Sequence, residues 1–179
     1  MEELKHEEVK IKEIVDKILH FWVENELNQL PCDIEEKMLA PGQPDEEWKF
    51  WLPVTSTVTD AELQEFETEI GFIFPDDFKI FLKYKHFYEL QISEVSFCSL
   101  PMSTWKASLR EMIFETYPRE FLFDKGYVPF AVYSDWGLLC FDTHNNNNNA
   151  VVRWDHEEPD FFEYQYQNFY ELLTEISKA

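Results

Sequence analysis

Glycine, cysteine and cationic residues are scarce in this sequence. Its 179 residues include 4 glycines and 3 cysteines, and 15 lysines and arginines stand against 36 aspartates and glutamates. The chain contains no glycine-rich phosphate-binding loop, and the GxSxG motif of many hydrolases is also missing. Cys32, Cys98 and Cys140 lie far apart and never form a CxxC pair, which argues against a disulfide framework or a zinc site.

Long apolar runs are missing as well. No segment approaches the roughly 18 consecutive apolar residues that a membrane-spanning helix needs. The first residues, Met1-Glu2-Glu3-Leu4, lack the basic flank and the apolar run of a signal peptide. Together with the dispersed cysteines, these absences predict a protein of the reducing cytoplasm.

The charge balance argues against two classes of partner. The formal net charge is -21, and a polyanion repels the phosphates of nucleic acids and the surfaces of anionic membranes. We therefore expect neither nucleic acid nor membrane as a partner. The charge fits two roles, solubility and attraction of a basic protein, and does not choose between them. Hydrophobic residues make up 45% of the chain, which predicts a folded domain with a packed core.

A capping box marks the start of a helix near residue 60. The Thr59 hydroxyl can accept a hydrogen bond from the amide three residues on, while the Glu62 side chain reaches back to the cap. The helix should therefore start at Asp60. Three- and four-residue spacing gives this helix one apolar stripe, which consists of Leu63, Phe66 and Ile70.

A second, shorter helix should follow after an extended link. Gly71 can take the left-handed conformation that a helix C-terminus commonly needs, so it should end the first helix. Pro75 suits the first position of the next helix, and Asp76 and Asp77 suit its positive N-terminal end. We interpret these two acids as helix caps.

Helical spacing predicts a long amphipathic helix at the start of the chain, over about 5–27, whose glutamate-rich polar face favours packing or self-association over membrane binding. Prolines and Gly42 mark the next stretch as a loop with a short helical turn at 34–39. Other patterns predict strands at 48–52 and 90–100 and helices at about 103–115 and 168–176.

Short apolar runs with tight turns begin at Val128. Residues 128–134, 137–142 and 150–154 predict three neighbouring strands of an antiparallel meander. The first turn is Asp135-Trp136-Gly137, and the second contains the asparagine run 145–149. The predicted fold is therefore α+β, with a central, mainly antiparallel sheet and helices packed on one side.

These segments, in this order, resemble the SMI1/KNR4 family, also called the SUKH superfamily. The resemblance covers about 48–173 and implies a single SUKH-like domain at 48–179, preceded by an added N-terminal amphipathic helix and proline-rich loop at 1–47. One departure is His86-Phe87-Tyr88, which stands where members usually have an Asn-Gly turn. The matching segments are Gly71-Phe72-Ile73-Phe74-Pro75-Asp76-Asp77, Pro129-Phe130-Ala131, Asp135-Trp136-Gly137, Phe141-Asp142, Val151-Val152-Arg153-Trp154-Asp155-His156-Glu157 and Asn168-Phe169.

The resemblance implies a binding role. Many bacterial members are similar to immunity proteins that bind a toxin domain, and fungal relatives regulate cell-wall synthesis and signalling. Together with the negative charge, this favours a non-enzymatic immunity protein that neutralises a toxin domain, for example a basic and nucleic-acid-directed one, without a cofactor. The alternative is an intracellular regulatory or scaffold protein that self-associates through the leading helix. A metal-dependent enzyme is the remote alternative.

The densest polar cluster in the chain is residues 154–160. Histidine, aspartate and glutamate can bind metal or transfer protons. On a strand, however, Asp155 and Glu157 would share one face while His156 would point to the other. Because nothing else in the chain has metal-ligand spacing, we expect no metal site and no catalytic residue.

The same acids suit a protein-binding surface better. Exposed rings can anchor a partner, and carboxylates beside them can attract a basic one. Trp136 lies in a turn and is a candidate anchor, whereas Trp154 is better explained as a core residue of the sheet. The candidate partner-binding residues are Asp135, Trp136, Asp155, Glu157 and Glu158.

Overall fold

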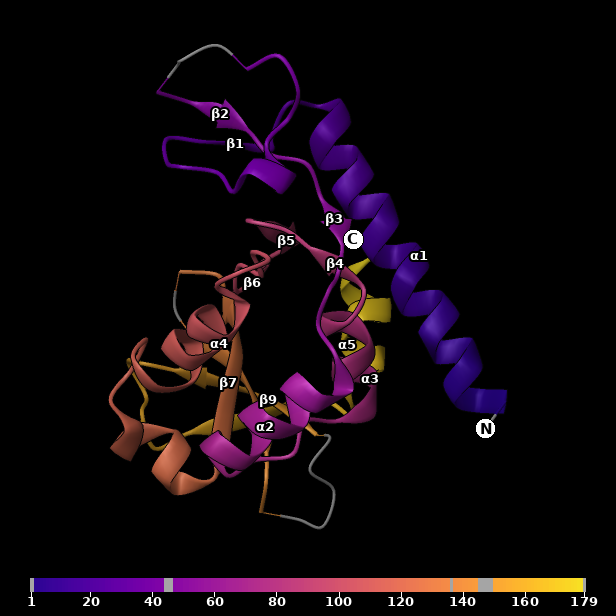
Figure 1. Ribbon diagram of the computed structural model, residues 1–179. Coiled ribbons are helices and arrows are strands. Elements are labelled where there is room, and N and C mark those ends of the chain that lie inside the picture. The colour runs from indigo at the N-terminus through magenta and orange to yellow at the C-terminus, as the bar shows by residue number, and fades with distance from the viewer. Residues whose placement is uncertain (1, 44–46, 136, 145–149, 179) are drawn as a thin grey trace.

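The computed structural model describes residues 2–43, 47–135, 137–144 and 150–178 (Figure 1). The α-helices are α1 Glu2–Glu24, α2 Asp60–Ile70, α3 Asp76–Leu82, α4 Trp105–Phe114 and α5 Phe169–Ile176, and the 3-10 helices are η1 Glu36–Met38, η2 Arg119–Phe121 and η3 Phe123–Lys125. The strands are β1 Gln29–Leu30, β2 Lys49–Phe50, β3 Val54–Thr55, β4 Lys85–His86, β5 Leu90–Ile92, β6 Val95–Phe97, β7 Tyr127–Tyr133, β8 Gly137–Asp142, β9 Val151–Asp155 and β10 Phe162–Tyr166.

Six of the strands form one antiparallel sheet in the order β10-β9-β8-β7-β6-β5. Neighbours in this sheet are consecutive in the chain, so it is a meander. Two small pairs, β1-β2 and β3-β4, lie outside it. The predicted strands at 128–134, 137–142 and 150–154 are β7, β8 and β9, and the predicted α+β class with a central antiparallel sheet is confirmed.

The capping box at the start of α2 forms as predicted. The Glu62 amide donates to Thr59 Oγ1 at 3.2 Å, and the Thr59 amide donates to Glu62 Oε2 at 2.9 Å. Gly71 ends the helix with φ of 74°, in the left-handed region that favours glycine. Both ends of α2 were thus predictable, because each depends on residues within one turn of the helix end.

The two acids at the start of α3 differ from each other. Asp76 is exposed, as a residue at a helix N-terminus can be, but Asp77 is buried. Asp77 Oδ1 accepts a hydrogen bond from the Phe78 amide at 2.8 Å, and its Oδ2 accepts one from the Tyr170 amide at 2.9 Å. Asp77 therefore connects the start of α3 to the start of α5 and does more than cap its own helix.

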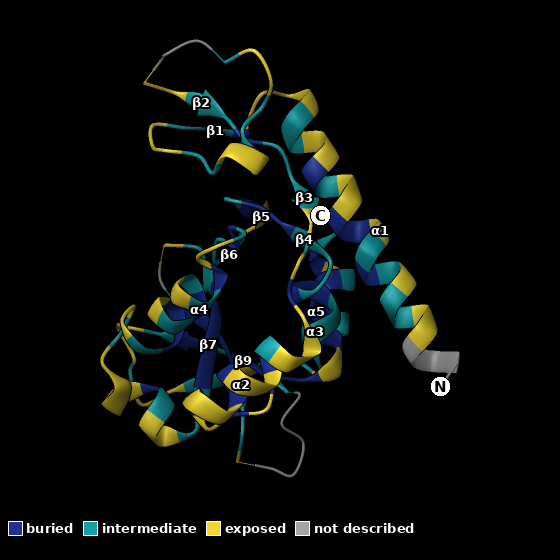
Figure 2. Cartoon of the chain, in the orientation of Figure 1, coloured by how far each residue is buried: buried dark blue, intermediate teal, exposed yellow. Residues whose placement is uncertain are grey.

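The core between the helices and the sheet is built from aromatic rings. Phe78 of α3 lies at its centre, 5.0 Å from the ring centre of Phe169 in α5 and 5.2 Å from that of Phe141 in β8. Phe130 of β7 stacks on Phe141 at 4.3 Å. Such ring pairs add about 0.5–1.5 kcal/mol each beyond the area that they bury. Strand β7 is buried along most of its length (Figure 2).

The other face of the sheet carries a smaller apolar cluster. Trp154 is 1% exposed and packs there with Leu138 and Val152. Met112 of α4 and Leu122 cover these side chains. The indole nitrogen of Trp154 donates a hydrogen bond to a backbone carbonyl 3.1 Å away. The prediction that Trp154 belongs to the core is therefore correct.

The leading helix belongs to the same core as the sheet. Helix α1 packs against α3 and α5 (Figure 1). The residues that it buries are Ile11, Ile14, Val15 and Leu19. At its C-terminal end the chain turns through Glu26, which has φ of 56°, into the small β1-β2 pair. None of the helices in the described part of the chain combines the length and apolar character that a bilayer-spanning helix requires.

The strands of the structure differ from the predicted strands in several places. Residues 90–100 form a hairpin and not one strand, because Ser93 takes φ of 54° and the chain reverses between β5 and β6. The predicted strand 48–52 is reduced to the two-residue β2. Strand β10 was not among the predicted strands, although its sequence, Phe-Glu-Tyr-Gln-Tyr, alternates ring and polar residues as a half-buried strand does.

Candidate functional site

The candidate partner-binding residues come together at one end of the sheet. Tyr133 of β7 pairs with Val95 of β6 and with Gly137 of β8, and Gly137 pairs with Asp155 of β9. This register places three turns side by side, at residues 93–94, 134–135 and 155–158. We name this region the acidic end of the sheet and define it by Glu94, Asp135, Asp155, Glu157 and Glu158. Trp136, the predicted aromatic anchor, lies outside the described residues.

Asp155 has a structural task that the sequence interpretation did not include. That interpretation placed Asp155 and Glu157 on one face of a continuing strand, but β9 ends at Asp155. Asp155 Oδ1 accepts the Glu157 amide at 2.8 Å, and its carbonyl accepts the Glu158 amide at 3.2 Å. These bonds make a turn, so Asp155 fixes the backbone while the Glu157 and Glu158 side chains are exposed.

Glu94 joins the acidic end although the sequence interpretation did not select it. Its carbonyl accepts the Ser134 amide at 2.7 Å, and its carboxylate accepts the Tyr133 hydroxyl at 3.0 Å. Burial raises the pKa of Tyr133, and the neighbouring Glu94 raises it further. Only the hairpin between β5 and β6 brings Glu94 to this end, so a reading of 90–100 as one strand could not place it.

Arg153 borders the acidic end on strand β9. Its guanidinium contacts Glu163 of β10 at 2.8 Å and lies 5.5 Å from the centre of the Tyr133 ring. Most other cations are paired in the same way: within the described residues, twelve of the 15 lysines and arginines form an ion pair with a carboxylate. Because acids outnumber bases by more than two to one, the charge that remains to face a partner is negative.

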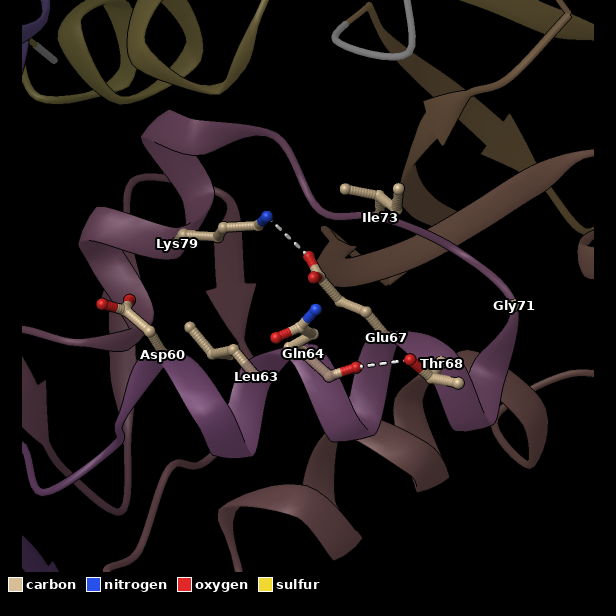
Figure 3. Close-up of a pocket in the computed structure, with 8 residues that line it drawn as sticks. All are labelled: Asp60, Leu63, Gln64, Glu67, Thr68, Gly71, Ile73 and Lys79. Carbon is tan, nitrogen blue, oxygen red and sulfur yellow. Dashed lines mark hydrogen bonds and ion pairs between the residues drawn. The ribbon is translucent and has the colours of Figure 1, made fainter.

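A hollow of about 570 Å³ lies between α2 and α3 (Figure 3). Glu67 lies at its base, where Oε1 accepts the Phe74 amide at 2.7 Å and contacts Lys79 Nζ at 2.9 Å. The exposed side chain of Ile73 stands at its rim. The Glu67 carboxylate is thus paired within the chain. One contact attaches α2 to the link between the helices, and the other attaches α2 to α3.

Two of the three cysteines have thiols of raised pKa. Burial raises the pKa of Cys98 to about 12 and also raises the pKa of Cys140, so both thiols stay protonated at neutral pH. In residues 2–43, 47–135, 137–144 and 150–178, no three histidine, cysteine, aspartate or glutamate side chains are arranged to hold a metal ion.

Comparison with known protein families agrees with the sequence resemblance. A family model described as SMI1-KNR4 cell-wall (SUKH_5) matches residues 45–178. The chain belongs to the SMI1/KNR4 family. No match was found in a comparison with curated proteins. Membership of the SMI1/KNR4 family supports a role as a protein-interaction module, and SMI1/KNR4 domains are generally non-enzymatic.

The segment that matches the SMI1/KNR4 family contains most of the structural features described above. It includes the capped α2, the buried Asp77, the whole six-stranded sheet and the acidic end. Helix α1 and the β1 strand lie before the matched segment. The acidic end therefore lies within the matched segment, whereas α1 lies before it and packs against α3 and α5.

Proposed function

We propose that this SMI1/KNR4 protein is an immunity protein that binds and neutralises a toxin domain in the cytoplasm, without catalysis and without a cofactor. Family membership supports a protein-binding role. The observation that carries the proposal further is the acidic end of the sheet, where Glu157 and Glu158 are exposed on a turn fixed by Asp155. Such a surface suits a basic toxin domain, for example one directed at nucleic acid.

Charge complementarity of this kind acts mainly on the rate of association. Complementary surfaces raise association rates by roughly 10- to 1,000-fold at low salt, and ionic strength screens the effect. Because most cations of this chain are paired internally, a basic partner would meet little local repulsion. A nucleic acid or an anionic membrane would meet the net charge of -21.

The test is co-purification with the product of a toxin gene adjacent to this one, followed by measurement of association rates. Glu157→Gln with Glu158→Gln should slow association about threefold at low salt. The matched control, Glu36→Gln with Glu120→Gln, removes the same charge from exposed positions that are not part of the acidic end. Failure to form any complex with that product would count against the proposal, and equal effects of the two double variants would remove the acidic end from it.

A regulatory or scaffold role through α1 is the second candidate. Val9 and Phe21 of α1 are 56% and 54% exposed, so both apolar side chains are accessible to a partner. Deleting α1 would not test this role, because the deletion would uncover the core residues beneath it. Light scattering on full-length protein with Val9→Ser and Phe21→Ser is the better experiment, since an unchanged mass would exclude self-association through these side chains.

A further inference from the structure

The two edges of the sheet are unequal. Strand β5, at one edge, has three residues, of which two are buried, and it contacts α1. Strand β10, at the other edge, has five residues, none of them buried. Among the described residues, β10 pairs with β9 alone. An edge strand directs one row of backbone N–H and C=O groups away from its neighbour, where another strand can pair with them.

Strand β10 also lacks common devices that protect an edge. Its sequence, Phe-Glu-Tyr-Gln-Tyr, contains neither lysine nor proline, although it has one register shift. Tyr164, in the middle of β10, is 59% exposed, and Phe161, immediately before the strand, is 55% exposed. The Phe162 ring stacks on Tyr127 at 3.6 Å, so the strand is well anchored on the side of the sheet. This edge thus combines backbone groups that can pair with a further strand and two rings that are more than half exposed.

The negative charge beside β10 determines which kind of added strand could pair with this edge. Residues 155–163 contain five carboxylates and no lysine or arginine. Asp160 and Glu163 are paired with Lys125 and Arg153, while Glu157 and Glu158 are exposed just ahead of the strand. A second copy of this chain, paired at this edge, would place its own five carboxylates opposite the five of the first copy. Like charges across a strand pair are destabilising. A basic segment would neutralise them.

We propose that β10 is the docking edge for an extended segment of a basic partner protein, which would add a seventh strand to the sheet. Backbone hydrogen bonds would supply affinity, as in other cases of strand addition. Phe161 and Tyr164 would pack on side chains of the added strand, and Glu157 and Glu158 would attract its lysines or arginines. This inference rests on the proposed function and specifies the surface and the conformation of the partner.

The experiment uses full-length protein and a synthetic peptide of alternating lysine and valine, about seven residues long. The comparison peptide has proline in place of valine, so it keeps the charge but cannot pair as a strand. Binding is measured by fluorescence anisotropy at low salt, and backbone contact by hydrogen exchange. We expect the lysine-valine peptide to slow hydrogen exchange in residues 162–166, and we expect the proline peptide to leave the exchange rates there unchanged.

Two double variants test the rings. Phe161→Ala with Tyr164→Ala should weaken binding of the lysine-valine peptide roughly tenfold. The control, Phe21→Ala with Ile73→Ala, removes exposed apolar side chains elsewhere and should change it less than about twofold. Equal affinity for the two peptides, or protection of another segment, would overturn the proposal. So would the absence of binding, or protection of residues 162–166 that rises with protein concentration alone, since that indicates a second copy.

The outcome can be separated from that of the proposed function. If a co-purified toxin protects other residues and leaves 162–166 unprotected, the immunity proposal stands and the docking edge falls. If the lysine-valine peptide protects 162–166 while the adjacent toxin forms no complex, the docking edge stands and the immunity role falls.

Discussion

Replacing Asp77 with alanine should destabilise the protein far more than the same change at its neighbour Asp76. Asp77 is 7% exposed and accepts two backbone hydrogen bonds, one of them from Tyr170 at the start of α5. Asp76 is exposed, so its contribution is limited to the helix dipole, about 0.3–1 kcal/mol. If both acids acted only as caps, the two variants would lose similar amounts.

The expected loss follows from the groups left behind. Each buried N–H that loses its partner costs about 1–3 kcal/mol. The loss of stability in Asp77→Ala should be smaller than the sum for two bonds. Burial raises the pKa of Asp77, which means that the ionised carboxylate is itself less stable here than in water. We therefore expect Asp77→Ala to lose about 2–3 kcal/mol of the free energy of unfolding, which corresponds to a fall in Tm of roughly 4–12 °C for a chain of this size.

Urea unfolding followed by tryptophan fluorescence measures both variants. Asp77→Asn refines the test. The two amides bond to different carboxylate oxygens, and asparagine keeps only one oxygen at these two positions, so its loss should lie between those of the wild type and Asp77→Ala. A loss below about 1 kcal/mol for Asp77→Ala, or equal losses for the two alanine variants, would refute the role of Asp77 as the connection between α3 and α5.

Three further predictions concern stability. His86 accepts a hydrogen bond from the Thr57 amide through Nε2 and contacts the Leu100 carbonyl through Nδ1. Because burial lowers the pKa of His86 below 6.5, the unfolded chain binds a proton first, and the free energy of unfolding should fall as pH drops from about 6.5 towards the lowered pKa. Unfolding of His86→Gln, measured across the same pH range, should lack this slope. Gly71→Ala should cost about 1 kcal/mol in urea unfolding, because φ at that position is 74°. Ile11→Ala should cost about 2–5 kcal/mol, since Ile11 is fully buried in the shared core, and a loss below about 1 kcal/mol would show that α1 is dispensable.

The parts of the fold that were predictable depend on neighbouring residues in the chain. Thr59, Glu62 and Gly71 define α2 through contacts within one turn of helix, and the strands β7 to β9 follow from short apolar runs. The Glu62 and Thr59 side chains lie three residues apart, so sequence spacing alone brings them together. The place of Trp154 within one of these strands likewise favoured a core position for its side chain.

The parts that were missed depend on distant contacts or on single backbone angles. Asp77 could not be linked to Tyr170 because 93 residues separate them. Glu94 reached the acidic end through a turn that depends on the φ angle of Ser93, and serine has no strong preference for that angle. The acids of the candidate site were selected by composition, while the turn formed by Asp155 required the observed end of β9.

The packing of α1 on α5 has a consequence for synthesis of the protein. The first helix of the fold contacts the last one, and an average ribosome adds about 5–20 residues per second. Helix α1 therefore leaves the ribosome well before α5 exists, and its apolar stripe has only part of its final binding surface during that interval. The core cannot close until residues 169–176 emerge. Closure of the core is then a late step, in which the last helix of the fold packs against the first.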